Sequence, residues 1–107
     1  MKRADLQKLM DFIILGDDRR RVTVNLDEHG DPDITYDAHG QTVLEARRAI
    51  RNIANITRSP ISVSVIHGYH HGTAIKDMLV KENFSGRLTN RYCPAGNPGE
   101  TILHIAA

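Results

Sequence analysis

The chain has 107 residues with one cysteine; 40% of its residues are hydrophobic, 25% are charged, and its formal net charge is +1. These values are ordinary for one globular domain, and they exclude a polycation, an intramolecular disulfide and a zinc site built from cysteines. No apolar run approaches the roughly 20 residues that cross a membrane. We therefore expect no membrane association and a reducing compartment, the cytoplasm.

The N-terminal part of the chain predicts a helix followed by a β-hairpin. Apolar residues recur at helical spacing over residues 4–15 and form one stripe. Residues 22–26 alternate between apolar and polar side chains, which is typical of a half-buried strand. A turn over residues 27–32 then leads into a second alternating segment, residues 34–38. In that segment the apolar face points inward, and the other face carries Asp37 and His39.

The next segment predicts a helix and a strand. Thr42 and Glu45 have the spacing of a capping box, and an apolar stripe follows them, so we expect a helix over residues 42–56. Pro60 separates this helix from residues 61–65, where valine and isoleucine alternate with serine. That alternation predicts another strand with one face buried and one face exposed to solvent.

The last part of the chain predicts one helix and two strands. The helix is expected over residues 73–83, and the strands over residues 87–93 and 101–106. Strand–helix–strand connections imply that the centre of the sheet is parallel or mixed. Because one face of each strand is expected to be exposed to solvent, we expect helices on only one side of the sheet. The expected fold is a two-layer α/β (α+β) sandwich with a mixed sheet of four to five strands over residues 21–107. An N-terminal helix and connector occupy residues 1–20.

Two loops carry the candidate chemistry. Tyr36-Asp37-Ala38-His39-Gly40 and Val65-Ile66-His67-Gly68-Tyr69-His70-His71-Gly72-Thr73 each join the end of an apolar strand to the start of a helix. If the two strands are parallel neighbours, both loops leave the same sheet edge, where ligands of open α/β sheets commonly bind. We expect His39 and His67 to face one cleft there, and the helix start after Gly72 to bind an anion.

Two imidazoles beside a phosphate site suit phosphodiester cleavage. An ordinary histidine pKa of about 6.5 lets one ring remove a proton and the other donate one near neutral pH. Each positioned acid or base contributes on the order of 10²–10⁴-fold to the rate. Asp37 could orient an imidazole or hold a Mg²⁺ ion delivered with the nucleic acid, since that ion prefers carboxylate and phosphate oxygens.

The same two loops resemble the signatures of the Smr (small MutS-related) domain. Residues 36–40, followed by Thr42 and Glu45-Ala46, resemble its Leu-Asp-x-His-Gly motif. Residues 65–72 resemble its His-Gly-x-Gly-x-Gly motif, and Asn97-Pro98-Gly99 fits its last hairpin. The resemblance implies a two-layer sandwich that nicks DNA, cleaves RNA or acts on ribosome-associated RNA. It places Asp37, His39 and His67 at catalytic positions, and Gly68 and Gly72 in the phosphate loop.

This sequence also departs from the Smr pattern. Tyr36 replaces the leading leucine, and His70 and His71 replace the middle glycine and the following threonine or serine. Lys76 follows Ala74-Ile75 where the family often has Leu-Arg. These departures favour an alternative, a non-catalytic module that binds nucleic acid or the ribosome. A third hypothesis is a protein-binding adaptor that uses the N-terminal helix.

The wider nucleic-acid surface has several candidates. The phosphate loop and its surroundings supply Gly68, Tyr69, His70, His71, Gly72, Thr73 and Lys76, with Tyr69 able to stack on an unpaired base. Arg47 and Arg51 could follow a phosphate backbone or simply form a solvated helix face. Arg87 and Arg91 are a second candidate contact. The histidine pair shows no closed ligand set, so Mg²⁺ at Asp37 is the cofactor we consider.

Overall fold

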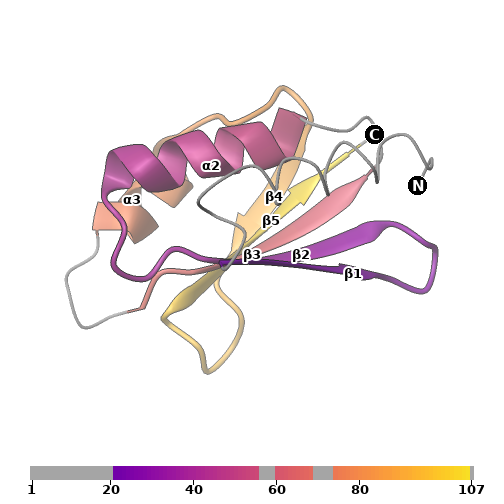
Figure 1. Ribbon diagram of the computed structural model, residues 1–107, viewed down its shortest axis with the longest axis horizontal. Coiled ribbons are helices and arrows are strands. Elements are labelled where there is room, and N and C mark those ends of the chain that lie inside the picture. Colours follow the sequence, from indigo (N-terminus) through magenta and orange to yellow (C-terminus); the bar gives the residue numbers. More distant parts are fainter. Residues whose placement is uncertain (1–20, 56–59, 69–73, 107) are drawn as a thin grey trace.

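The computed structural model describes residues 21–55, 60–68 and 74–106, which form a mixed sheet and two helices (Figure 1). The elements in chain order are β1 (Val22–Leu26), β2 (Pro32–Asp37), α2 (Val43–Asn55), β3 (Ile61–Ile66), α3 (Ala74–Lys81), β4 (Leu88–Tyr92) and β5 (Glu100–Ile105). This α+β architecture confirms the predicted fold class. The predicted helix at residues 4–15 lies outside the described residues. Neither described helix is long and apolar enough to cross a membrane.

The sheet has five strands in the order β1-β2-β3-β5-β4. β1 pairs antiparallel with β2, which confirms the predicted hairpin. β2 in turn pairs parallel with β3. β5 lies between β3 and β4 and is antiparallel to both. The parallel pair at the centre brings the carboxyl ends of β2 and β3 to one edge, as the sequence predicted. The insertion of β5 could not be predicted from strand order along the chain.

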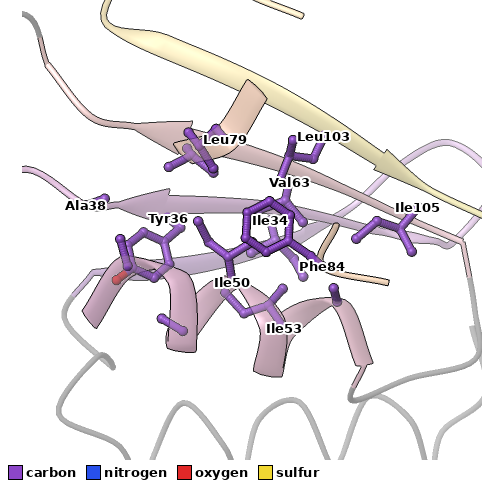
Figure 2. Close-up of a cluster of buried hydrophobic side chains, with 14 of the residues drawn as sticks. Ile34, Tyr36, Ala38, Ile50, Ile53, Val63, Leu79, Phe84, Leu103 and Ile105 are labelled. Atoms are coloured by element: carbon purple, nitrogen blue, oxygen red, sulfur yellow. The ribbon is translucent and has the colours of Figure 1, made fainter. Parts of the chain in front are cut away.

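One face of the sheet is buried and the other is open, because side chains alternate along each strand. In β2, for example, Ile34 and Tyr36 are fully buried, whereas Asp33 is exposed. The helices α2 and α3 cover the buried face (Figure 1). Figure 2 shows side chains from the sheet and from both helices meeting in one core: Ile34, Tyr36, Ala38, Ile50, Ile53, Val63, Leu79, Phe84, Leu103 and Ile105.

The start of α2 follows the predicted capping box. The N–H of Thr42 donates to Oε1 of Glu45 at 3.0 Å, and the N–H of Glu45 donates to Oγ1 of Thr42 at 3.1 Å. Two N–H groups that have no intrahelical acceptor are thereby satisfied. β2 begins two residues earlier than predicted, at Pro32, because proline is tolerated as the first residue of a strand.

Two arginines hold the carboxyl ends of the helices. Arg87 donates to the carbonyl oxygen of Ala54 at 2.8 Å, at the end of α2. Arg91 donates to the carbonyl oxygens of Leu79 and Glu82 at 3.0 and 2.6 Å, at the end of α3. Carbonyls at a helix end lack intrahelical donors, so these guanidinium groups satisfy them. The two side chains that the sequence suggested as phosphate contacts are therefore bonded within the fold.

Replacing Arg91 should destabilise the fold without changing its charge. The substitution Arg91→Lys keeps the cation but loses the planar guanidinium group, in which Nη1 donates to both carbonyl groups and Nη2 donates to Oδ1 of Asn83. We therefore expect a loss of about 1–2 kcal/mol in the free energy of unfolding. Chemical denaturation followed by circular dichroism measures it. Arg48→Lys, at an exposed position of α2, is the matched control and should change stability little. Equal losses for both variants would contradict the capping role.

Candidate functional site

The two candidate loops lie side by side at one edge of the sheet. Asp37 pairs with Ile66 in the parallel ladder, and the N–H of Ala38 donates to the carbonyl oxygen of Ile66 at 2.8 Å. Each loop then turns sharply at a glycine in the left-handed backbone conformation: Gly40, with φ of 80°, and Gly68, with φ of 72°. Residues other than glycine rarely adopt this conformation, so these two positions fix where the loops leave the sheet.

A cleft of about 440 Å³ opens between the loops and the two helix starts. Its lining comes from the loop after β2, the first residues of α2 and α3, and the end of β3: Gly40, Gln41, Thr42, Val43, His67, Ala74, Ile75 and Lys76. The capping box uses the N–H groups of Thr42 and Glu45, while those of Val43 and Leu44 have no intrahelical acceptor. The cleft thus combines the N-termini of two helices, which carry a partial positive charge, with one lysine and one histidine.

The imidazole of His67 is held on both nitrogens. Nδ1 lies 3.0 Å from the carbonyl oxygen of Gly68, and Nε2 lies 2.9 Å from Oγ1 of Thr101. A carbonyl oxygen only accepts, so Nδ1 must carry a proton, and in the neutral ring Nε2 accepts from the threonine hydroxyl. Thr101 is only 2% exposed. Sγ of Cys93 lies 3.7 Å from the same hydroxyl and extends the chain of contacts.

The turn between β4 and β5 supports the His67 loop. The N–H groups of His67 and Gly68 both donate to the carbonyl oxygen of Gly99, at 2.9 and 3.0 Å. Gly99 in turn donates to Oδ1 of Asn97 at 3.2 Å, and the Asn97 amide donates to Glu100 at 2.8 Å. The Asn-Pro-Gly segment noted in the sequence is therefore placed directly against the loop that carries His67.

Asp37 and His39 do not line the cleft. Asp37 lies between the buried residues Tyr36 and Ala38, so its side chain belongs to the open face of the sheet. Its Oδ1 accepts the backbone N–H of His39 at 3.0 Å. His39 is exposed, and its imidazole forms no hydrogen bond with another described residue. The structure brings the two loops together as expected, but of the two histidines only His67 lines the cleft.

Two residues that sequence reasoning missed shape the first loop. The guanidinium group of Arg21 donates to the carbonyl oxygens of Asp37 and His39, at 3.1 and 2.7 Å. The hydroxyl of Tyr36, which stands where the Smr motif has leucine, donates to Oε1 of Gln41 in the cleft wall. Tyr36 is fully buried, so this bond links the core to the cleft. No local sequence signal identifies either contact, since both depend on how the loop turns.

Five residues of the predicted phosphate loop lie outside the described residues: Tyr69, His70, His71, Gly72 and Thr73. Within residues 21–55, 60–68 and 74–106, no three histidine, cysteine or acidic side chains are grouped so that they could hold a metal ion. Asp37 alone would offer a Mg²⁺ ion one carboxylate, one oxygen of which already accepts a hydrogen bond.

Arg47 and Arg51 pair with Glu82 just after α3. Nε of Arg47 lies 3.7 Å from Oε2 of Glu82, and Arg51 contacts Oε1 of the same carboxylate. These contacts join α2 to the segment that follows α3. The predicted arginine pair therefore has a structural contact, and it lies outside the cleft lining.

No family model, no curated protein and no solved structure matches this chain. The geometry of the site and the motif resemblance are therefore the two observations that bear on function.

The capping box should make stability depend on pH. The backbone N–H of Thr42, and then its hydroxyl, lower the pKa of Glu45 below its ordinary value of 4.5. A lowered pKa in the folded state adds stability above the unfolded pKa, and this stability is lost as the pH falls through the folded pKa. Glu45→Ala should therefore be less stable than wild type at neutral pH, and the difference should narrow below about pH 4.5. Thermal unfolding across this range measures it; a constant difference would contradict the interpretation.

The hydroxyl of Thr101 should contribute to stability through His67. Thr101→Val keeps the shape but leaves Nε2 of His67 without its buried partner, so we expect a loss of about 1–3 kcal/mol in the free energy of unfolding. Thr101→Ser keeps the hydroxyl and is the matched control. Chemical denaturation compares the two. A serine variant as unstable as the valine variant would show that the lost methyl packing, rather than the hydrogen bond, is responsible.

Proposed function

We propose that this protein is a nucleic-acid-binding domain of Smr type, and that the cleft between the two loops holds a phosphodiester group of RNA or DNA. One observation carries the proposal: the loops after β2 and β3 meet, so that two helix starts, His67 and Lys76 surround one cleft. The motif resemblance supports the same assignment. It extends the proposal to ribosome-associated RNA as a substrate class.

The chemistry of the cleft suits an anion. Helix N-termini carry a partial positive charge and N–H groups without intrahelical acceptors. Lys76 adds a full positive charge as a point contact for phosphate. A second cleft of about 440 Å³ lies at the opposite edge of the sheet, lined by Asp27, Asp31 and Asp33 among others. Hydrogen bonds from the Asp31 and His29 backbones lower the pKa of Asp27, so this second cleft stays acidic and would repel a phosphate.

Endonuclease action is the second candidate, and the exposed imidazole of His39 favours it. In that mechanism His39 removes a proton from the attacking hydroxyl, His67 protonates the leaving oxygen, and Asp37 orients His39 or holds a Mg²⁺ ion. Such a group must come within hydrogen-bond reach of the proton that it transfers. Nε2 of His67 already contacts Thr101, and His39 lies outside the cleft lining. We therefore place binding first and cleavage second.

We also propose that the protein works in the cytoplasm. Cys93 is exposed and unpaired, which suits a reducing compartment.

The first experiment measures binding of labelled RNA and DNA, single-stranded, duplex and branched, as a function of salt. Removing one phosphate contact should lower the log–log slope by about 0.7 for single strands and about 0.9 for duplex DNA. We expect this loss for Lys76→Ala. Lys81→Ala removes the same charge from an exposed position of α3 outside the cleft lining and should lower the slope less. Binding that does not respond to salt, or equal slopes for both variants, would reject the cleft.

The same substrates separate binding from cleavage. Wild type, His39→Ala and His67→Ala are incubated with end-labelled substrate, with and without chelator. Retention without cleavage supports the binding module. Cleavage that both variants lose would instead establish the nuclease, and its sensitivity to chelator would decide the role of Mg²⁺. Cleavage that survives in both variants would exclude these two histidines as its source.

A further inference from the structure

The outer face of α2 carries a groove of about 250 Å³ that is separate from the cleft. It is lined by Leu44, Arg47, Arg48, Arg51 and Asn52. These positions recur at helical spacing, on the side opposite the buried residues Ala46, Ala49, Ile50, Ile53 and Ala54. Three of the five lining residues are arginines, which is a strong local concentration of positive charge in a chain with a net charge of only +1.

Glu82 positions two of these arginines from the side of α3. It contacts one nitrogen of Arg47 and one nitrogen of Arg51, and a guanidinium group carries five N–H donors. Nε of Arg47 is buried, and its distance of 3.7 Å from the carboxylate exceeds that of a hydrogen bond. Both arginines therefore keep donors for another acceptor while Glu82 limits their motion. Arg48 is exposed, and it interacts with Glu45, three residues earlier on α2, through a Coulombic attraction that helps to lower the pKa of that carboxyl group.

The charges of the groove select an anionic partner. Three arginines outnumber the two nearby carboxylates, Glu82 beside Arg47 and Arg51 and Glu45 near Arg48, so the groove keeps a net positive charge. A planar guanidinium group matches the paired oxygens of a phosphate. The groove begins at Leu44, one residue after Val43 in the cleft lining. The nine residues from Val43 to Arg51 are separated by eight helical rises of about 1.5 Å, which span about 12 Å along the helix axis. At a rise of about 3.4 Å per nucleotide, this span corresponds to about three or four nucleotides of one strand.

We propose that the arginine groove of α2 is a second phosphate-binding site, and that one nucleic-acid strand runs from the cleft along the outer face of α2. This inference rests on the proposed function, because the cleft anchors one end of the strand. It adds a substrate requirement: the strand must be long enough to reach both sites. Arg48 makes a phosphate contact, while Arg47 and Arg51 bind further phosphate oxygens from positions that Glu82 holds.

The test compares single-stranded oligonucleotides from a dinucleotide to an octanucleotide, with wild type and Arg48→Ala. For wild type, affinity should rise with length until about four nucleotides and then level off, and Arg48→Ala should lower the salt slope for the longer strands by about 0.7. The dinucleotide fills only the cleft, so Arg48→Ala should bind it as wild type does. Lys81→Ala is the charge-matched control, and thermal unfolding of each variant confirms that the fold is kept.

The outcomes separate this inference from the proposed function. Equal effects of Arg48→Ala and Lys81→Ala, or a wild-type affinity that does not depend on length, would overturn the groove. A lowered slope for Arg48→Ala combined with no effect of Lys76→Ala would reject the cleft and the continuous path, leaving only binding at the groove. Strands that wild type does not bind at any length would refute both proposals.

Discussion

The parallel pairing of β2 with β3 is the constraint on which the rest of the site depends. Asp37 stands opposite Ile66, so the two strands end level with each other and their loops start from one edge. Because side chains alternate with a period of two, a slip of one residue would turn the buried face of a strand outward. Ile34, Val63 and Val65 are all fully buried, so core packing opposes such a slip. The position of the cleft is therefore set by the hydrophobic core.

The arginines of this chain divide into structural and available groups, although the sequence presents them alike. Arg87 and Arg91 satisfy carbonyl groups at the helix ends, and Arg21 holds the loop after β2. A helix end that is partly buried needs such donors, because unsatisfied carbonyls are costly. Arg48, at an exposed position on the outer face of α2, has no such contact among the described residues. The charge available for a nucleic acid is thus much smaller than the total of 14 lysines and arginines.

Local patterns predicted the elements, whereas contacts between distant residues could not be predicted. Alternation identified the strands, and the spacing of Thr42 and Glu45 gave the start of α2, because these signals lie within a few residues. The adjacency of the two loops followed from the expectation of a parallel pair. The bond between His67 and Thr101 joins residues 34 positions apart. It depends on the placement of β5 beside β3, which no local signal encodes.

The register also gives the two histidines different positions relative to the ends of the paired strands. Asp37 pairs with Ile66, and both lie on the open face, so the next residues along the strands, Ala38 and His67, turn toward the helices. Ala38 therefore stands level with His67, and His39 lies one residue further along its loop. In Tyr36-Asp37-Ala38-His39 and Val65-Ile66-His67 the histidines therefore follow the paired residues Asp37 and Ile66 at different spacings, two residues and one residue. Binding in the cleft requires only residues that line it, such as His67 and Lys76, whereas acid–base chemistry shared by both histidines would also require the imidazole of His39, which is not part of the lining.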